Sequence, residues 1–461
     1  MKTTDKWLIC VIILATCLRL AAYGQVVSPK TNKRVTFTLN QILDSAKANN
    51  INIRNAQLVI KAAEEQRKEA FTKYFPNVSA TGLWFNANRS MTQMDVNLSE
   101  SMPPTLAASL AQTLPPEALM ELGAPISVEM MKNGTLAGVS AVQPVFAGGQ
   151  IVNGNRLAKV GEEASKLQFQ LSENEVERTA EQYFWQIVAL EEKKNTVLAV
   201  EKWLNDICKD VNTAVTAGVA MKNDLLQVQL KQNEVESQKL KLENGIGIVK
   251  MLLAHHCGLQ DTTFVLHYDP NDIPLPSTMK KDPAIALERT PEYQLLNKQV
   301  EAATLQKKIA VGENMPTVAV GAGYNYHNLL GNDRTFAMVF ATVNIPISSW
   351  WGGSHAIKRK EIEQQKAIDQ LADNSELLLI RMQKGWNDVV EAYQQLCIAQ
   401  RSIEQAKENL RLQNDYYKAG ISTMSDLLEA QTLYQQSLDK HTDAFADYHN
   451  KILEYKQAVG Y

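Results

Sequence analysis

The 461-residue sequence lacks a charge imbalance, because 47 basic residues face 50 acidic ones and the pI is near 6.2. Its overall charge therefore indicates neither a nucleic-acid partner nor binding to an anionic membrane surface. Cysteine is scarce, and Cys208, Cys257 and Cys397, which follow the amino-terminal region, form no CxxC pair. Their odd number favours buried small side chains over a disulfide framework.

Catalytic and ligand-binding motifs are missing as well. The seven histidines are scattered, and the adjacent pair His255–His256 would point in different directions on a helix. Gly321-x-Gly323 and Gly352–Gly353 lack the rest of a dinucleotide or phosphate-binding fingerprint. We therefore expect a protein that is not an enzyme and that has no catalytic, cofactor or metal site.

A long hydrophobic run occurs at the amino terminus. Two lysines flank the start of the apolar run Trp7–Leu18, and small residues follow it, as in a secretory signal peptide. The run is too short to be a spanning helix. We predict a signal peptide over residues 1–24 and an N-terminal extension over 25–38. A lipoprotein signal with its lipid on Cys17 is the alternative, since the preceding residues approximate that pattern.

The sequence of one tight turn occurs twice in the chain. The stretches AGVAMKNDLLQVQ (Ala217–Gln229) and AGISTMSDLLEAQ (Ala419–Gln431) share a glycine and an Asp-Leu-Leu sequence at the same spacing. A glycine followed by polar residues and an acid is typical of one helix end and the capped start of the next. Gly218 and Gly420 are therefore predicted to be the tip turns of two helical hairpins.

Four prolines give further evidence of this duplication. Pro76 and Pro144 correspond to Pro316 and Pro346, and we predict each at a junction between a helix and a strand. The first pair lies farther apart than the second, which indicates an insertion over residues 93–131 that reads as a long surface loop.

The predicted order is helix, strand, strand, helix, turn, helix in both copies. The first repeat covers 39–257, a linker covers 258–282, and the second repeat covers 283–461. The strands are predicted at 77–88, 135–146, 317–327 and 335–347. Each copy has one very long helix with coiled-coil spacing, such as Gln150 to about Thr216, which would extend ~100 Å.

The strand Thr317–His327 alternates apolar or aromatic residues with small or polar ones. Such strands fit a transmembrane β-sheet as well as a soluble one. The candidates for interfacial aromatic belts are Trp84, Tyr324, Tyr326, Trp350 and Trp351. Four strands cannot close a membrane barrel, since the smallest barrels have eight, so membrane-spanning strands would require several copies in one cyclic assembly.

Four stretches together resemble the TolC-like outer-membrane efflux proteins: FTLNQILDSAKANNINI, YFPNVSA, QPVFAGGQI and the tip YYKAGISTMSDLLEAQTLY. The resemblance covers nearly the whole mature chain. It implies an α+β membrane protein that forms a homotrimer, with a twelve-stranded outer-membrane β-barrel (four strands per chain) continued by a long periplasmic α-helical barrel. It also implies contact with outer-membrane lipid, a periplasmic adaptor and an inner-membrane pump, for export of small molecules in a tripartite efflux system.

The resemblance also implies a gate at the hairpin tips. Asp426 and Glu429 match acidic positions that ring the periplasmic entrance, and Asp224 and Tyr417 match an inter-helix pair whose hydrogen bond helps hold it closed. Ser422 replaces an arginine of the family pattern, which removes one of the usual closing salt bridges. From the residues alone, Asp224 and Asp426 equally fit helix-capping acids.

Two other functions remain open at this point. A channel of the same build can serve type I protein secretion, since the inner-membrane pump chooses the cargo. A periplasmic coiled-coil adaptor fits less well, because an adaptor would have one helical hairpin whereas two tips are predicted here.

Overall fold

The computed structural model describes residues 35–96, 102–118, 126–329 and 333–460. The predicted signal peptide, Cys17 and most of the N-terminal extension lie outside the described residues. The chain divides into two compact units. Unit 1 comprises Met1–Ala46, Ala180–Ile273 and Glu408–Thr442, and unit 2 comprises Lys47–Thr179, Pro274–Lys407 and Asp443–Tyr461.

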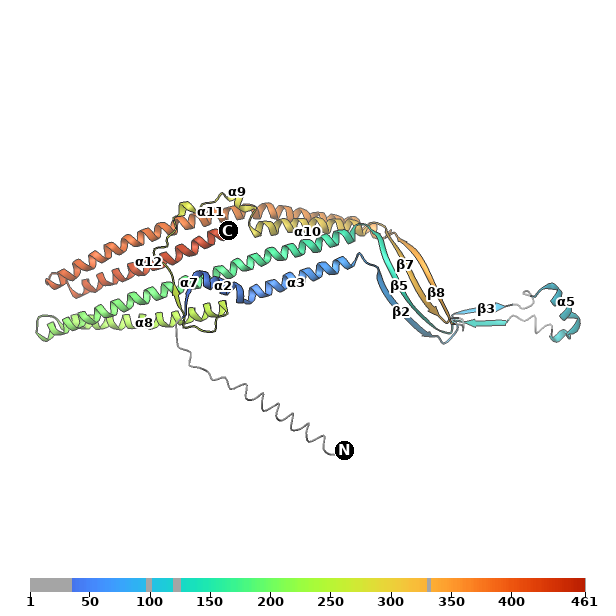
Figure 1. Cartoon of the computed structure of the whole chain (residues 1–461), viewed down its shortest axis with the longest axis horizontal. Coiled ribbons are helices and arrows are strands. Elements are labelled where there is room, and N and C mark those ends of the chain that lie inside the picture. Colours follow the sequence, from blue (N-terminus) through green and yellow to red (C-terminus); the bar gives the residue numbers. More distant parts are fainter. Residues whose placement is uncertain (1–34, 97–101, 119–125, 330–332, 461) are drawn as a thin grey trace, which may run out of the picture. The chain divides into compact units, whose positions relative to one another are not determined.

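Helices make up most of the chain (Figure 1). The main ones are α2 (Leu39–Asn49), α3 (Ile51–Thr72), α7 (Gln150–Thr216), α8 (Lys222–Cys257), α10 (Pro291–Glu313), α11 (Ser349–Lys418) and α12 (Met424–Ala458). With 67 residues, α7 has the bounds expected from its apolar spacing, and α11 is longer still at 70 residues. None of the described helices is long and apolar enough to cross a membrane.

The four-stranded sheet has the order β2-β5-β7-β8, with all neighbours antiparallel (Figure 1). Its strands are β2 (Asn77–Asn86), β5 (Asn133–Ala147), β7 (Thr317–His327) and β8 (Arg334–Asn344). They correspond to the four strands predicted from the sequence. Within one chain β2 and β8 each pair on one side, so both edges of the sheet present open backbone hydrogen-bonding groups.

Two segments contain more structure than the sequence indicated. The insertion 93–131 is not a plain loop, since β3 (Thr92–Val96) pairs with β4 (Ile126–Met130) and helix α5 (Pro104–Thr113) lies between them in sequence. Proline misled the prediction here, because Pro104 occupies the first turn of α5, where no N–H partner is needed. In the linker 258–282, β6 (Val265–His267) pairs in parallel with β1 (Thr36–Thr38) of the N-terminal extension.

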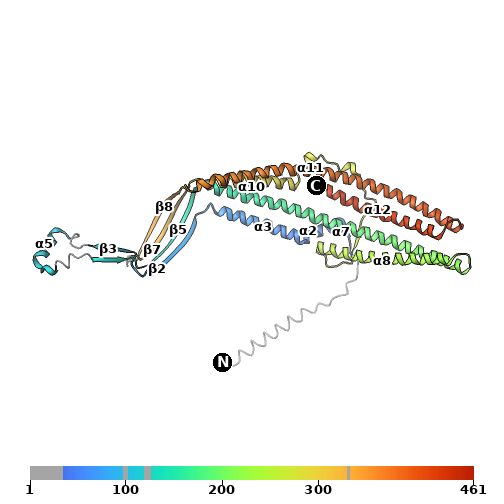
Figure 2. The same ribbon diagram turned by 180° about the vertical axis from the view of Figure 1, so that it is seen from behind.

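Figures 1 and 2 show the ribbons of the two hairpins, α7–α8 and α11–α12, and the core of unit 1 is built from side chains of both. Helix α7 contributes side chains spaced three and four residues apart, as in a coiled coil. The buried members are Val197, Val200, Leu204, Ile207 and Val211 of α7, Val228 and Val235 of α8, and Met424 and Leu427 of α12. Tyr417 and Leu410 of α11 pack against this cluster, so the α7–α8 and α11–α12 tips form one packed body.

In unit 2, ion pairs connect α3 to α7, α7 to α10 and α10 to α11. This order matches the order of the adjoining strands in the sheet, β2-β5-β7-β8. Glu162 of α7 binds Arg67 of α3 at 2.7 Å, and the next residue, Glu163, binds Lys298 of α10 at 2.6 Å. Lys307 of α10 binds a glutamate of α11 at 3.1 Å. Such pairs add little stability individually, but consecutive glutamates that bind opposite neighbours fix the rotation of α7 between them.

We predict that Leu204→Ala loosens the unit 1 core, because Leu204 is fully buried and its truncation leaves a cavity that costs about 2–5 kcal/mol. Hydrogen–deuterium exchange in α7 around this position should accelerate strongly. Lys202→Ala, two residues away and exposed, is the matched control and should leave the exchange unchanged. Equal exchange in both variants would contradict the assigned core.

Candidate functional site

The register of the four strands separates two faces of the sheet. We call the first the apolar face because its side chains are nearly all aliphatic or aromatic. It comprises Val78, Ala80, Gly82 and Trp84 of β2, Thr135, Ala137, Val139, Ala141, Gln143 and, after the register shift, Phe146 of β5, Val318, Val320, Ala322, Tyr324 and Tyr326 of β7, and Thr335, Ala337, Val339, Ala341 and Val343 of β8. Its larger residues are exposed in one chain, with Val339 at 86% and Trp84 at 70%.

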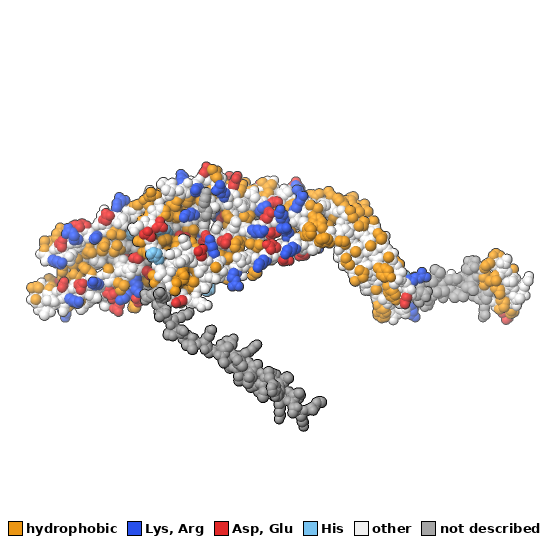
Figure 3. Space-filling model, viewed as in Figure 1, with side chains coloured by type: hydrophobic (Ala, Val, Ile, Leu, Met, Phe, Trp, Pro, Cys, Tyr) orange, Lys and Arg blue, Asp and Glu red, His pale blue; other side chains and the backbone are white. Residues whose placement is uncertain are grey.

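The opposite face, the polar face, carries hydroxyl, amide and glycine residues next to the helices. There it presents Asn77 and Ser79 of β2, Ser140 of β5, Thr317 of β7, and Thr342 and Asn344 of β8, interspersed with the apolar Val142 and Pro144 of β5, Ala319 of β7 and Phe340 of β8. Across the four strands there is a single Lys, Arg, Asp or Glu, which is Arg334 at the start of β8. Figure 3 shows hydrophobic side chains over the sheet and charged ones over the helices. A two-faced, almost uncharged sheet is typical of a membrane barrel wall.

The predicted belt residues lie at the two ends of the strands. Trp84, Tyr324 and Tyr326 share the apolar face near the end that leads into loops, and the Tyr326 hydroxyl donates to Asp333 at 2.8 Å. Trp350 and Trp351 lie at the other end, in the first turn of α11, and the Trp350 indole donates to the carbonyl of Asn314 at 2.9 Å.

A further aromatic cluster at the helix end was missed by sequence reasoning. Phe71, Tyr74 and Phe75 lie where α3 meets β2, with ring centroids of Phe71 5.6 Å from each of the other two. All three are exposed in one chain. The stretch FTKYFPN carried the signal, since it places three aromatic residues just before a strand.

Three of the four prolines lie at helix–strand junctions. Pro76 and Pro316 directly precede β2 and β7, and Pro346 lies between β8 and α11. The prediction for Pro144 was wrong, because Pro144 lies inside β5, at the register shift between Pro144 and Phe146. A bulge tolerates a residue without an N–H, and the turn into α7 is made instead by Gly148–Gly149 with φ of 59° and 76°.

Both hairpin tips turn on a left-handed glycine. Gly218 has φ 75° and Gly420 has φ 72°, which only glycine adopts without strain. At both tips the N–H after the glycine donates to a carbonyl five residues back, at 2.9 Å for Val219 and 2.8 Å for Ile421. These are the hydrogen bonds of a Schellman helix end.

The second tip has a complete capping box. The Asp426 carboxylate accepts hydrogen bonds from the Thr423 N–H at 3.0 Å and the Thr423 hydroxyl at 2.7 Å, while the Asp426 N–H donates to the Thr423 hydroxyl at 3.2 Å. These bonds from Thr423 lower the pKa of Asp426, so their stabilisation is complete above the ordinary carboxyl pKa and is lost as the pH falls through the lowered one. The capping role of Asp426 is therefore present in the structure.

The first tip has half of that box. Asp224 accepts a hydrogen bond from the Met221 N–H at 3.4 Å, but Met221 has no hydroxyl to return one. Tyr417 is half-buried, and burial followed by the charge of Asp224 raises its pKa. Within the described part of the chain, no hydrogen bond joins Tyr417 to Asp224. Glu429 is exposed, and the Ser422 hydroxyl donates to the Gln413 carbonyl at 3.3 Å.

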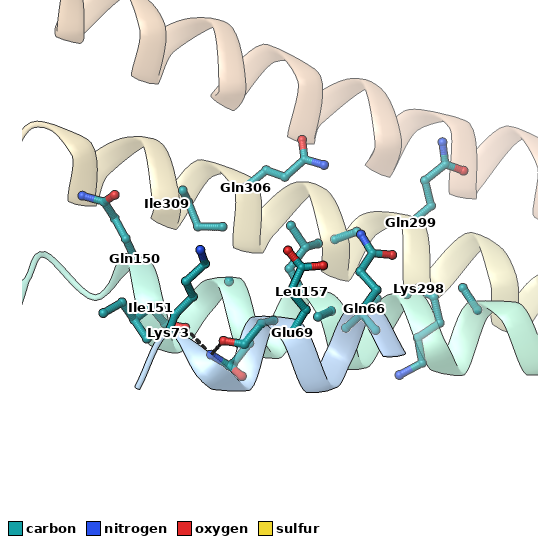
Figure 4. Close-up of a pocket in the computed structure, with 18 of the residues that line it drawn as sticks. Gln66, Glu69, Lys73, Gln150, Ile151, Leu157, Lys298, Gln299, Gln306 and Ile309 are labelled. Carbon is teal, nitrogen blue, oxygen red and sulfur yellow. Dashed lines mark hydrogen bonds between the residues drawn. The ribbon is translucent and has the colours of Figure 1, made fainter. Parts of the chain in front are cut away.

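Unit 2 also contains an open groove of about 880 Å³ between α3, α7 and α10. Figure 4 shows Gln66 and Glu69 of α3, with Lys73 directly after this helix, on one side and Gln299, Gln306 and Ile309 of α10 on the other. Small residues of α7, such as Gly154, Ala158 and Gly161, lie between them. Among the described residues, no group of three or more His, Cys, Asp or Glu could hold a metal ion.

Comparison with known families identifies the second half of the chain. The sequence model of the family described as Outer membrane efflux protein matches residues 283–460. These residues carry the sequence pattern of the outer membrane efflux protein family. The match spans β7, β8, α11 and α12, which confirms the resemblance stated from the sequence. A comparison with curated protein sequences gave no match.

The fold of nearly the whole chain is that of outer-membrane channels. The outer membrane protein VceC of Vibrio cholerae is 14% identical with a TM-score of 0.71, covering 92% of this chain and 96% of that one. The Campylobacter jejuni CmeC outer membrane channel is 15% identical with a TM-score of 0.72, covering 92% and 85%. The Neisseria gonorrhoeae MtrE outer membrane channel is 14% identical with a TM-score of 0.69, covering 92% and 88%.

We predict that the cap of this efflux-family tip depends on Thr423. Thr423→Ala should raise the hydrogen-exchange rate at the start of α12 about fivefold, because the hydroxyl that accepts from the Asp426 N–H and donates to its carboxylate is lost, while the backbone N–H of residue 423 remains. Met221→Ala is the matched control at the first tip, where no hydroxyl cap exists, and should leave exchange at the start of α8 nearly unchanged. Similar effects at both tips would contradict the difference between the two caps.

Proposed function

We propose that three copies of the chain form an outer-membrane channel, in which the four-stranded sheets close into one twelve-stranded β-barrel. The observation that carries this proposal is the sheet itself: an almost uncharged apolar face, a polar face, and two open edges at β2 and β8. In lipid an open edge costs several kcal/mol per unpaired group, so β2 of one copy would pair with β8 of the next. The apolar face would then contact lipid and the polar face line the pore.

The strand lengths support this proposal. At about 3.3 Å per residue, the 11 residues of β7 or β8 suffice to cross a hydrocarbon layer when tilted. Trp84, Tyr324 and Tyr326 would form the belt at the loop end. Trp350, Trp351 and the cluster at Phe71 would form the belt at the helix end.

The helices would continue the pore through the periplasm. The element order α3, β2, β5, α7, α8 recurs as α10, β7, β8, α11, α12, which supports a duplicated repeat with residues 39–257 and 283–461 as its copies. The long helices of three copies would then form a helical barrel that ends at the tips turned by Gly218 and Gly420.

At the tips, we assign partner contact and gating to different residues. Val219 and Ile421 occupy equivalent positions and are 80% and 74% exposed, which suits docking of a periplasmic adaptor that links the channel to an inner-membrane pump. Asp426 and Glu429 of three copies would place six carboxylates at the entrance and favour cations there. Asp224 and Tyr417, coupled through charge, would help keep it closed.

The channel function is tested by reconstituting the full protein in planar bilayers. We expect discrete single-channel currents that are blocked by divalent cations added on the tip side. Asp426→Asn combined with Glu429→Gln should weaken that block, because asparagine keeps an acceptor for the Thr423 N–H while the charge is lost. Unchanged cation block would remove the acidic gate, and the absence of any current would contradict the channel.

For the closing pair, we predict that Tyr417→Phe raises the conductance of the resting channel. The hydroxyl is the polar group that Asp224 influences, and phenylalanine preserves the packing of Tyr417 against the unit 1 core. Tyr416→Phe, at an exposed neighbouring position, is the control. An unchanged resting conductance would leave Asp224 as a helix-capping residue alone.

A further inference from the structure

The polar face of the sheet is not polar along its whole length. Toward the loop end it carries large apolar side chains at both edges of the sheet, Leu83 and Phe85 on β2 and Phe336 and Met338 on β8. Leu83, Phe336 and Met338 remain 55%, 44% and 43% exposed in one chain. The ring of Phe85 lies against the backbone of β5 at Gly134, since a Cβ atom at Gly134 would be 3.0 Å from this ring.

These residues require a neighbouring copy to come together. Because β2 and β8 are opposite edges of one sheet, Leu83 and Phe336 are separated by two strands within a chain. In the closed barrel, β2 of one copy lies beside β8 of the next, which brings the two apolar groups together at each seam. Arg334, the first residue of β8, lies on the same face. It pairs with His327, which pairs with Leu136, and Leu136 pairs in turn with Leu83.

We propose that each seam of the barrel, resting on the proposed trimer, forms a binding site near the pore exit for amphiphilic organic anions. The apolar body of the ligand contacts Leu83 of one copy and Phe336 and Met338 of the next. The guanidinium of Arg334 lies on the same face and binds the anionic head group. Asn325, which covers Gly138, and His327 complete the polar side chains of this zone.

The test uses single-channel currents of the full protein with butanesulfonate and octanesulfonate added on the loop side. The wild type should be blocked by octanesulfonate at about a tenfold lower concentration than by butanesulfonate, since four more methylenes gain apolar contact. The triple variant Leu83→Ser, Phe336→Ser, Met338→Ser should lose this chain-length difference. Arg334→Gln should weaken block by both anions to a similar extent.

Thr342→Ser, on the same face near the helix end of β8, is the matched control and should keep the wild-type block. If the triple variant assembles poorly, Met338→Ser is measured in its place. It should give an intermediate difference between the blocking concentrations of butanesulfonate and octanesulfonate. The proposed binding site at the seam would be overturned if the triple variant and Met338→Ser both formed channels of normal conductance and kept the wild-type difference between block by octanesulfonate and by butanesulfonate. That result would leave the channel proposal intact. The absence of channels in the wild type would overturn both.

Discussion

The account depends on the backbone hydrogen bonds at the two edges of the β2-β5-β7-β8 sheet. One chain satisfies these groups on one side of β2 and one side of β8, while the apolar face of the same strands is suited to hydrocarbon. Lipid offers no hydrogen bonds to an open edge, so the edges must meet other strands. In the proposed trimer a second and third copy of the chain would supply them, and the closed barrel would make the polar face the lining of the pore.

At the two hairpin tips, too, backbone groups at the ends of helices need hydrogen-bond partners. Gly218 and Gly420 make the same Schellman turn, yet the helices that follow begin differently, with Thr423 and Asp426 completing a capping box that Met221 cannot. Asp426 therefore combines a local structural role with the proposed position in an acidic entrance. The two roles are compatible, because hydrogen bonds from Thr423 favour the charged form of the carboxyl, which is the form that the proposed gate would use.

Much of this fold could be predicted from the sequence, because its periodic signals are long. The spacing of apolar residues located α7, and the alternation Val-Ala-Val-Gly-Ala-Gly-Tyr located β7. Proline was less reliable. Pro104 starts a helix inside the supposed loop, and Pro144 lies at a bulge inside β5. The position of Pro144 depends on its pairing with β7, far away in the sequence, which local patterns do not contain.

The functional surfaces were harder to predict for the same reason. The polar face and its apolar zone at Leu83, Phe336 and Met338 emerge only when the register pairs residues of the two repeats that are far apart in sequence, such as Leu136 and His327. The capping role of Asp426 could be read locally, whereas a carboxylate ring at a pore requires the assembly.

Native mass spectrometry of the detergent-solubilised protein tests the central claim most directly, because it counts the chains that share one particle. The account predicts particles of three chains that survive gentle removal of the detergent micelle. Monomeric particles across the same conditions would contradict it, since the β2 and β8 edges would then have no partner.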